Sequence, residues 1–284
     1  MANATPGVPG ERRITRRTFL MGLAGAGLAT GYPVLVERVM VQVNHYDIPI
    51  VGLAPPFDGF RLVHLSDLHY AEFTSASWLG RVLDRAQEEA GDLIVLTGDY
   101  VHARKTREQL DTIWPELTRI DAPFGVRMVL GNHDHWADSD HALGLLEASG
   151  RSLRNRAEVL RKDGAELVLA GTGDLWEDEV RIDETLAGQD PASPRIVLTH
   201  NPDTADLPHR ERVDLFVCGH THGGQVRLPV LGAPILAVAN KAYDQGLRWS
   251  ARSRLFINRG IGWAVLPFRL NCPPEIAVLH LRAA

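Results

Sequence analysis

Five apolar segments of this chain are each followed at once by a short polar cluster. In α/β sheets, ligands gather outside the carboxyl ends of the strands, so five such ends can converge on one site. A chain with this pattern is therefore constrained to bring several strand ends together at one edge. The clusters span residues 66–69, 98–99, 131–134, 199–200 and 219–222, and they are rich in Asp, Asn and His.

The last cluster lies in the segment CGHTHGGQVRLP, residues 218–229. A surface turn requires Gly, Asn or Pro, but it does not require the paired imidazoles of His220 and His222. Glycines beside a strand end mark a sharp bend or a close approach of another group. Imidazoles at such a place indicate a metal ion, and a mixed nitrogen and oxygen set suits Mn, Fe or Zn better than Ca or Mg.

The order of the expected elements predicts the fold class. Strands and helices alternate in the first half, whereas strands follow one another in the second half. This order favours an α/β fold, a four-layer α-β-β-α sandwich of two mixed sheets with helices outside and the site at the strand carboxyl ends. Proline predicts a kink or a restart at Pro115. Strands are expected at 38–43, 59–65, 92–99, 125–134, 165–174, 194–203, 213–222, 253–260 and 274–281, and helices at 75–90, 107–120 and 139–149.

The first 36 residues predict a targeting segment. Residues 15–20, TRRTFL, resemble the twin-arginine export motif, and the chain carries no charge from Thr18 to Val36. A basic start followed by an apolar run is typical of a signal sequence. A membrane anchor remains the alternative, because no clear cleavage site follows. We therefore expect a leader over 1–36 and one domain over 37–284.

Charge and cysteine content exclude two classes of protein. The formal net charge is −5, and because the leader is basic, the body is more acidic still. An acidic body argues against broad nucleic-acid binding. Cys218 and Cys272 are the only cysteines, which excludes a disulfide scaffold and predicts two buried thiols. We expect a monomer.

The ordered motifs D-x-H, G-D, G-N-H-D, H and G-H-x-H resemble those of the calcineurin-like metallophosphoesterase family. The resemblance runs from about residue 60 to the end of the chain. The segments GHTHGGQVRLP, NRGIG and CPPEIAVLHL are similar to a small bacterial branch of exported or membrane-associated phosphoesterases. That branch is similar in turn to enzymes that cleave UDP-diacylglucosamine.

The family resemblance implies a centre of two divalent transition-metal ions. Asp67 and His69 are two residues apart, so both can face one side of a strand end. Together the ions would carry more charge than two carboxylates offset, and could clamp a phosphate and activate water. The resemblance implies Asp67, His69, Asp99 and His222 as ligands of the first ion, and Asn132, His200 and His220 as ligands of the second, with the catalytically important Asp99 shared by both.

His133 has a separate implied role. The resemblance makes it a catalytic residue that contacts the phosphate beside Asn132 and protonates the leaving group. In phosphoprotein phosphatases, an aspartate after the G-D motif pairs with this histidine. Here the corresponding position is His102, so the partner of His133 is left open.

These observations predict a metal-dependent hydrolase of phosphodiester or pyrophosphate bonds. Its substrate would be a phosphoester, with a lipid-linked or sugar-nucleotide lipid compound as one candidate. A phosphoprotein phosphatase and a metal-bound, non-catalytic scaffold are the alternatives, although no ligand of the set is missing. The leader predicts export by the twin-arginine machinery to the periplasm or cell envelope, where the protein would associate with the outer face of the membrane it has crossed.

Two further expectations concern apolar residues. The stretch 227–239, RLPVLGAPILAVA, is expected to be buried; if exposed, it would suit an acyl chain or a membrane surface. Trp176, Trp249 and Trp263 are expected to pack in the core, with a substrate mouth as the alternative. His64, within an expected strand, is expected to pack or to form a hydrogen bond.

Overall fold

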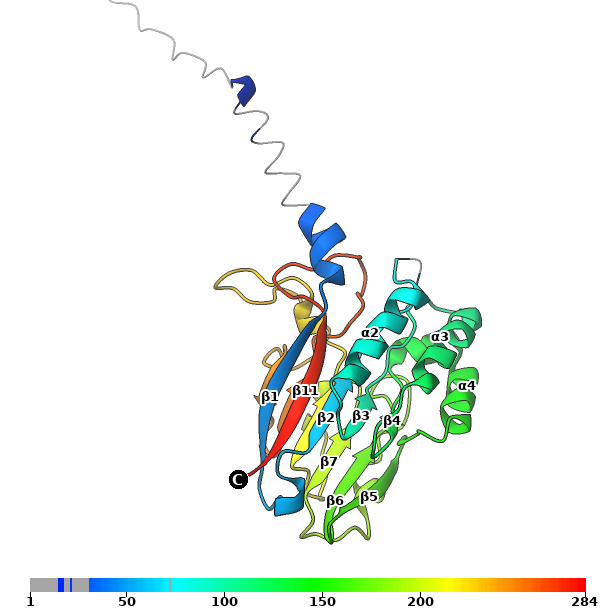
Figure 1. Cartoon of the computed structure of the whole chain (residues 1–284), viewed down its shortest axis with the longest axis vertical. Coiled ribbons are helices and arrows are strands. Elements are labelled where there is room, and N and C mark those ends of the chain that lie inside the picture. Colours follow the sequence, from blue (N-terminus) through cyan, green and yellow to red (C-terminus); the bar gives the residue numbers. More distant parts are fainter. Residues whose placement is uncertain (1–14, 18–20, 22–30, 72) are drawn as a thin grey trace, which may run out of the picture.

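The computed structural model describes residues 15–17, 21, 31–71 and 73–284. Two β-sheets pack face to face, and helices cover the outer side of one of them (Figure 1). Most of the expected leader lies outside the described residues, so the structure leaves that expectation open. Within the described part, no helix combines the length and the apolar character needed to cross a bilayer.

The first sheet has five strands in the order β1-β11-β2-β3-β4. The parallel pair β1 and β11 runs antiparallel to β2, whereas β2, β3 and β4 are parallel to one another. The carboxyl ends of β2 and β3 therefore lie at the same edge as the amino end of β1. The strands are β1 (Gln42–Ile50), β2 (Arg61–Leu65), β3 (Leu93–Leu96), β4 (Val126–Met128) and β11 (Glu275–Ala283).

The second sheet has six strands in the order β5-β6-β7-β8-β10-β9. Its four central strands are parallel, and the two edge strands are antiparallel to their neighbours. Both sheets are thus mixed, as predicted. The strands are β5 (Arg156–Lys162), β6 (Ala165–Gly171), β7 (Arg195–Leu198), β8 (Leu215–Cys218), β9 (Gly246–Trp249) and β10 (Arg254–Ile257).

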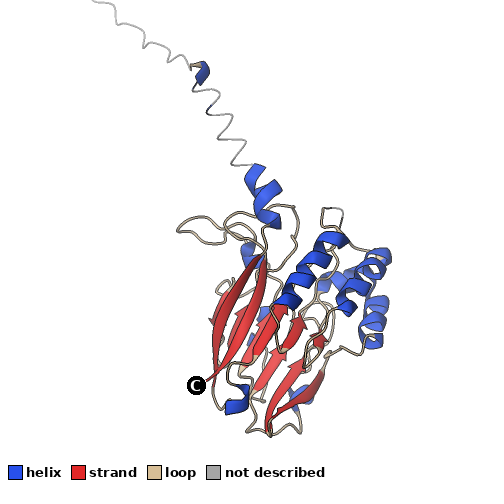
Figure 2. Ribbon diagram, viewed as in Figure 1, coloured by secondary structure: helices blue, strands red, loops and turns tan. Residues whose placement is uncertain are grey.

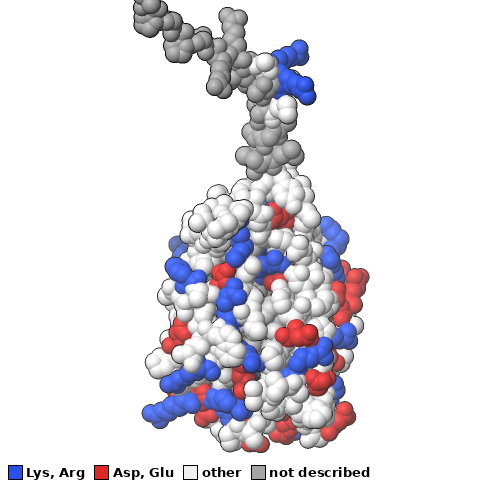
Figure 3. Space-filling view, turned by 90° about the vertical axis from the view of Figure 1, so that its left-hand side faces the viewer, with Lys and Arg blue, Asp and Glu red and all other residues white. Residues whose placement is uncertain are grey.

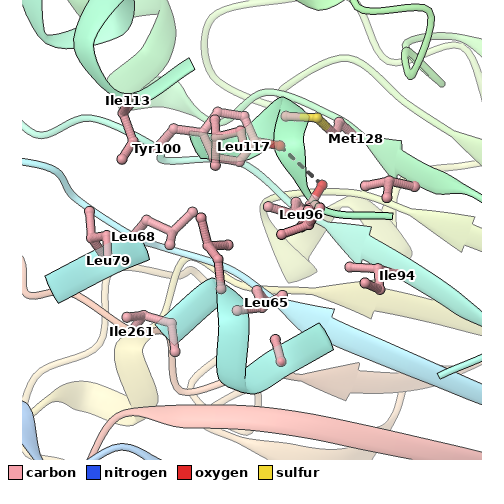
Figure 4. Packing of buried hydrophobic residues seen from close by; sticks show 14 of the residues in the cluster. Leu65, Leu68, Leu79, Ile94, Leu96, Tyr100, Ile113, Leu117, Met128 and Ile261 are labelled. Atoms are coloured by element: carbon pink, nitrogen blue, oxygen red, sulfur yellow. Dashed lines mark hydrogen bonds between the residues drawn. The ribbon is translucent and has the colours of Figure 1, made fainter. Parts of the chain in front are cut away.

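Helices α2 (Ala76–Glu88), α3 (Arg107–Arg119) and α4 (Asn132–Ala148) cover the outer face of the first sheet (Figure 2). The hydroxyl oxygen of Ser75 caps α2 by accepting from the backbone N–H of Trp78. Leucines and isoleucines of the helices pack on the sheet residues Leu65, Ile94 and Leu96 (Figure 4). The buried Tyr100 hydroxyl donates to the carbonyls of Leu96 and Val129, which ties this layer to the strand ends.

The outer face of the second sheet is covered by shorter elements. These are α5 (Ile182–Leu186), the 3₁₀ helix η4 (Pro202–Asp206) and the segment 225–245. Tyr243 of that segment is buried and donates to Asp206 of η4. The α/β sandwich of two mixed sheets is therefore confirmed, and its fourth layer consists largely of short turns and loop. Both thiols are buried, as predicted.

Several boundaries differ from the prediction. The first strand is β1 at Gln42–Ile50, not 38–43, because residues 37–39 form a 3₁₀ turn and Pro49 is tolerated at the edge of the sheet. Helix α3 continues through Pro115 without a restart. Helix α4 begins at Asn132, where a strand was expected, and breaks at Asp138 before its predicted part. Strands β5 and β9 were not predicted.

Candidate metal centre

Five of the seven predicted ligands have a left-handed backbone. The φ angles are 54° for Asp67, 45° for His69, 55° for Asp99, 69° for His220 and 52° for His222. Positive φ is uncommon outside glycine, and such strain persists only where the surrounding structure enforces it. The chain thus turns sharply after β2, β3 and β8, and these turns aim the side chains at a common point.

Asp67, His69 and His222 form one group of potential ligands. The Nε2 atoms of His69 and His222 lie 3.0 Å apart, and Nε2 of His222 lies 3.3 Å from Oδ1 of Asp67. All three side chains are buried. Two imidazole nitrogens and a carboxylate that face one another away from water fit a shared cation.

Asp99, His200 and His220 form a second group. Nε2 of His200 lies 3.2 Å from Oδ2 of Asp99 and 3.1 Å from Nδ1 of His220. The other nitrogen of His200 donates to the carbonyl of Thr97, and Nε2 of His220 donates to the carbonyl of Ala237. These outer bonds fix both rings so that the remaining nitrogens face the group, as is usual for metal ligands.

Asp99 lies between the two groups. Its Oδ2 is 3.5 Å from Nε2 of His69 and 3.2 Å from Nε2 of His200. Its Oδ1 accepts from the backbone N–H of His133. Asp99 therefore lies next to one histidine of each group, and its role as a shared ligand stays a prediction.

Asn132 is the first residue of α4, and its side chain is buried. Its Oδ1 has no hydrogen-bond partner among the described residues. An unpaired buried oxygen costs free energy, so it fits a position that a cation satisfies. Asp134 has a structural role, since its carboxylate accepts from the backbone N–H groups of Gly131, Asp99 and Tyr100.

Glycine is required where the second sheet approaches Asp67. A Cβ atom at Gly219 would lie 1.8 Å from Oγ of Ser66 and 2.4 Å from Oδ2 of Asp67. The next backbone N–H, that of His220, donates to the Asp67 carboxylate at 3.0 Å. Gly219 therefore serves close approach, whereas Gly223 and Gly224 supply the bend through positive φ.

The electrostatics of the centre favour an added positive charge. Burial lowers the pKa of His200, but the facing Asp99 outweighs this and raises that pKa to about 10. Burial raises the pKa of Asp99, yet His200 and His133 hold it well below its usual value. Without a metal ion, the pair thus keeps a proton on His200 at neutral pH. A divalent cation could take the place of that proton.

His133 finds its partner in the backbone. Its Nδ1 lies 2.6 Å from the carbonyl oxygen of His102, which leaves Nε2 for the cavity that His133 lines. The His102 ring stacks on His133 and places its own Nδ1 3.3 Å from Nδ1 of His69. Burial lowers the pKa of His102 to about 4, so this ring is neutral at pH 7.

A cavity of about 590 Å³ opens over the centre. One wall consists of Arg104, Trp136 and Trp176, and the Arg104 guanidinium lies 3.9 Å from the centroid of the Trp136 ring. Trp176 is half exposed, so its predicted core position is wrong, as is that of the exposed Trp249. Trp263 is buried against His102, as predicted. No sequence signal identified Arg104 or Trp136.

An apolar groove of about 260 Å³ adjoins the cavity and shares His220 and His222 with it. The expectation that 227–239 is buried is wrong, because Val230, Leu231 and Ile235 are exposed. They protrude because proline and glycine break this stretch into turns that leave the sheet. The aliphatic and aromatic groove residues are Val226, Pro234, Ile235, Val265, Leu266 and Phe268.

Arg269 is a buried residue behind the centre that sequence reasoning missed. Its guanidinium donates to the carbonyls of Gly260 and Gly262 and lies 3.3 Å from Nδ1 of His222. It therefore fixes the loop after β10 against the first ligand group. Its segment, FRLN, carries no motif that could have indicated this role.

Comparison with known proteins agrees with this geometry. The family model described as calcineurin-like phosphoesterase matches residues 60–224. The chain is 32% identical to the metallophosphoesterase YkuE of Bacillus subtilis, over 96% of this chain and 99% of that protein. It is 34% identical to the phosphodiesterase YaeI of Escherichia coli, over 94% and 99%. It is 24% identical to the UDP-2,3-diacylglucosamine pyrophosphatase LpxG of Chlamydia muridarum, over 86% and 90%.

Proposed function

This chain belongs to the calcineurin-like phosphoesterase family of metal-dependent phosphoester hydrolases, and we propose that it cleaves phosphodiester or pyrophosphate bonds in a lipid-linked substrate. The observation that carries the proposal is the junction of two spaces. The cavity over the metal centre, which several predicted ligands and His133 line, continues into an apolar groove, and His220 and His222 line both. A phosphate at the centre would thus have room for an acyl chain beside it.

The seven buried side chains would hold two divalent ions. Asp67, His69 and His222 would bind the first, and Asn132, His200 and His220 the second, with Asp99 facing both. The nitrogen and oxygen donors suit Mn, Fe or Zn. Ions in such a site polarise phosphoryl oxygens and make water a better nucleophile.

His133 is placed to act on the leaving group. Because Nδ1 is engaged by the His102 carbonyl, the ring is held with Nε2 toward the cavity. From there Nε2 can hydrogen-bond a phosphoryl oxygen and pass a proton to the departing oxygen. Asn132 precedes it on the first turn of α4 and would contact the same phosphate.

The opposite wall of the cavity fits a polar, planar group. Trp136 and Trp176 offer ring faces, and Arg104 offers a cation beside them. Such a wall can stack on a base or pair with a second phosphate. The name of the relative LpxG states a substrate that has acyl chains, a sugar and a nucleotide, which agrees with these two unlike walls.

The alternative functions have less support. A phosphoprotein phosphatase would place a carboxylate beside His133, whereas this chain offers a backbone carbonyl. A non-catalytic scaffold would not need His133, Trp136 and Arg104 directed at one cavity. Both alternatives also leave the apolar groove without a use.

The substrate class is tested by comparing kcat/KM on three soluble or micellar compounds with the metal-loaded enzyme. These are a phosphomonoester, a short-chain phosphodiester and a diacylated sugar-nucleotide diphosphate. We expect the diester and the diphosphate to be cleaved and the acylated compound to be preferred. Ile235→Ser in the groove should remove that preference and leave short-chain turnover intact. Equal rates on acylated and short-chain compounds would remove the lipid but leave the phosphoesterase.

We also propose that the protein is exported through the twin-arginine route and works on the outer face of the membrane that it has crossed. The support is the TRRTFL motif and the uncharged run that follows it. Replacement of both Arg16 and Arg17 by Lys should retain the protein inside the cell. Unchanged distribution after cell fractionation would contradict export by this route.

A further inference from the structure

Five aliphatic side chains protrude from two loops beside the metal centre. Val230 is fully exposed, and even Leu266, the least exposed of the five, has 63% of its surface accessible. Soluble proteins rarely leave such a contiguous apolar surface without a function. We call this surface the aliphatic rim; it consists of Val230, Leu231, Ile235, Val265 and Leu266.

The rim is one fixed surface because its two loops are tied together. They follow β8 and β10, which are parallel neighbours and end at the same edge. Gln225 joins the loops, since its side-chain amide donates to the carbonyl of Leu266 and accepts from the N–H of Ala264. A backbone bridge between Val226 and Leu270 adds a second tie.

Two valines of the rim have a strained backbone. Val230 has a φ of 69° and Val265 a φ of 64°, and both stand at exposed turns. Glycine or asparagine would occupy this region at lower cost, and a β-branched residue is a genuine outlier there. Exposed valine at both turns therefore destabilises the fold in water and requires another reason.

The N-terminal segment reaches the body at the same end of the molecule (Figure 1). The Pro33 carbonyl accepts from the N–H of Arg269, and the Glu37 carboxylate accepts from the N–H of Cys272, both next to the rim loop. Leu35 of this segment is exposed as well. Residues without a charge dominate the surface around the base of the segment, and charged residues of both signs become frequent farther down (Figure 3).

We propose that the aliphatic rim docks on a lipid bilayer and inserts its side chains among the outermost acyl groups. Three observations favour a bilayer over a protein partner. Among the exposed residues of segments 226–240 and 263–271, which form the two loops, none is Trp, Tyr or Arg, the anchors typical of protein interfaces. In the sequence, the uncharged run from Thr18 to Val36 is followed directly by Glu37, whose carboxylate accepts from the N–H of Cys272 next to the rim loop. The apolar groove opens at the rim, since Ile235, Val265 and Leu266 belong to both.

Docking would orient the metal centre for a substrate that stays in the membrane. An acyl chain could then pass from the bilayer along the groove while its phosphate reaches the centre. This second part rests on the proposed function, whereas docking itself does not. The two are therefore tested by different readouts.

Docking is tested by the depth of a fluorescent label on the full-length protein in vesicles of phosphatidylethanolamine and phosphatidylglycerol. Both native cysteines are buried, so Val230→Cys supplies the only exposed thiol for an NBD label. Ala192→Cys is the control, because Ala192 is exposed and precedes β7 at the opposite end of the sheet. Leu231→Cys is a second site should the first variant fail to fold.

We expect the rim label to shift to the blue and to be quenched by nitroxides on lipid acyl chains, with neither change at the control position. A rim label that stays water-exposed would overturn the proposal. So would a rim label protected only as protein concentration rises, with a dimer in sedimentation, because a second copy would then cover the surface.

Activity separates docking from catalysis. Val230→Ser combined with Leu231→Ser should weaken vesicle binding about tenfold or more. The same variant should hydrolyse soluble bis(p-nitrophenyl) phosphate at the wild-type rate. Val51→Ser, an exposed aliphatic residue just after β1 at the far end, is the matched control and should bind vesicles normally. If the wild type and both variants all fail to hydrolyse bis(p-nitrophenyl) phosphate, the proposed function is contradicted. Docking is then decided by the depth of the fluorescent label alone.

Discussion

The Nδ1 atom of His133 lies 2.6 Å from the backbone carbonyl oxygen of His102. Phosphoprotein phosphatases place an aspartate in this role, and the side chain of His102 is not its substitute. A carbonyl orients the imidazole as a carboxylate would, but it carries no full charge. The orientation of His133 therefore depends on the fold of the loop after β3 rather than on the identity of residue 102.

His102→Ala should accordingly retain most activity, with a change in kcat of less than about tenfold. The backbone carbonyl persists in the variant, so His133 keeps its orientation. Steady-state kinetics on a soluble phosphodiester gives the answer. A loss as large as that of a missing acid group, about 10²-fold or more, would show that the imidazole of His102 itself takes part.

His133→Ala should lower kcat by about 10²–10⁴-fold, the usual range for a lost acid or base. Metal content should stay at the wild-type level, because Nδ1 of His133 is engaged by the His102 carbonyl and His133 belongs to neither the Asp67 group nor the Asp99 group, although it can form a group with His69 and His102. Elemental analysis of the purified variant is the control. If metal is lost together with activity, His133 is a ligand and its assignment as an acid is wrong.

Gly219→Ala should impair metal binding and lower the melting temperature. The added Cβ would lie 1.8 Å from Oγ of Ser66 and 2.4 Å from Oδ2 of Asp67, so the loop must move away from the first ligand group. Gly144→Ala in α4 is the matched control, since its Cβ would meet nothing within 4 Å. The control should be neutral or stabilised by about 0.5–1 kcal/mol. Equal metal content in both variants would contradict the close approach.

His64 should make the protein sensitive to acid. Burial lowers the pKa of His64 to about 3. Its Nε2 donates to the hydroxyl oxygen of Thr97, in agreement with the expectation that His64 packs or forms a hydrogen bond. In the unfolded chain the imidazole of His64 binds a proton below about pH 6.5, whereas in the folded chain it stays neutral at that pH. Stability from this group is therefore complete above pH 6.5 and falls by about 1.4 kcal/mol per pH unit as the pH drops toward 3.

His64→Gln removes this titration and keeps a donor for Thr97. Urea unfolding of the metal-free proteins at pH 7.5 and 5.5 provides the comparison, with chelator present so that metal loss does not contribute. We expect the wild type to lose about 1.4 kcal/mol more than the variant over this interval. An equal loss in both proteins would show that His64 does not titrate as inferred.

The fold class and the convergence of the ligands could be predicted because they depend on local patterns. Short apolar runs predict the strands of the sheets. The polar cluster after each of five runs predicts the edge at which these strand ends converge. The backbone conformation of Asp67 and Asp99 could not be read in this way, because positive φ is enforced by neighbours distant in sequence. Strand β5 had a signal that went unused, the Asp163-Gly164 turn typical of a hairpin.

Tertiary contacts decided what the sequence left open. Arg269 has its role only because Gly260, Gly262 and His222 surround it. Trp136 belongs to the cavity because α4 begins at Asn132, earlier than predicted, and Arg104 joins the same wall because its guanidinium packs on the Trp136 ring. Val230 and Leu231 were expected to be buried because they are hydrophobic, but both are exposed. The proposal of a membrane-docking surface starts from this difference.

The central claim is that hydrolysis depends on metal ions shared through Asp99. The most direct test is a titration of Mn²⁺ into chelator-treated enzyme, with bound metal and phosphodiester turnover measured in the same samples. We predict no turnover without metal, full turnover as a second ion binds, and no turnover for Asp99→Ala at any Mn²⁺ concentration. Turnover that survives complete metal removal, or an Asp99→Ala variant as active as the wild type, would contradict the account.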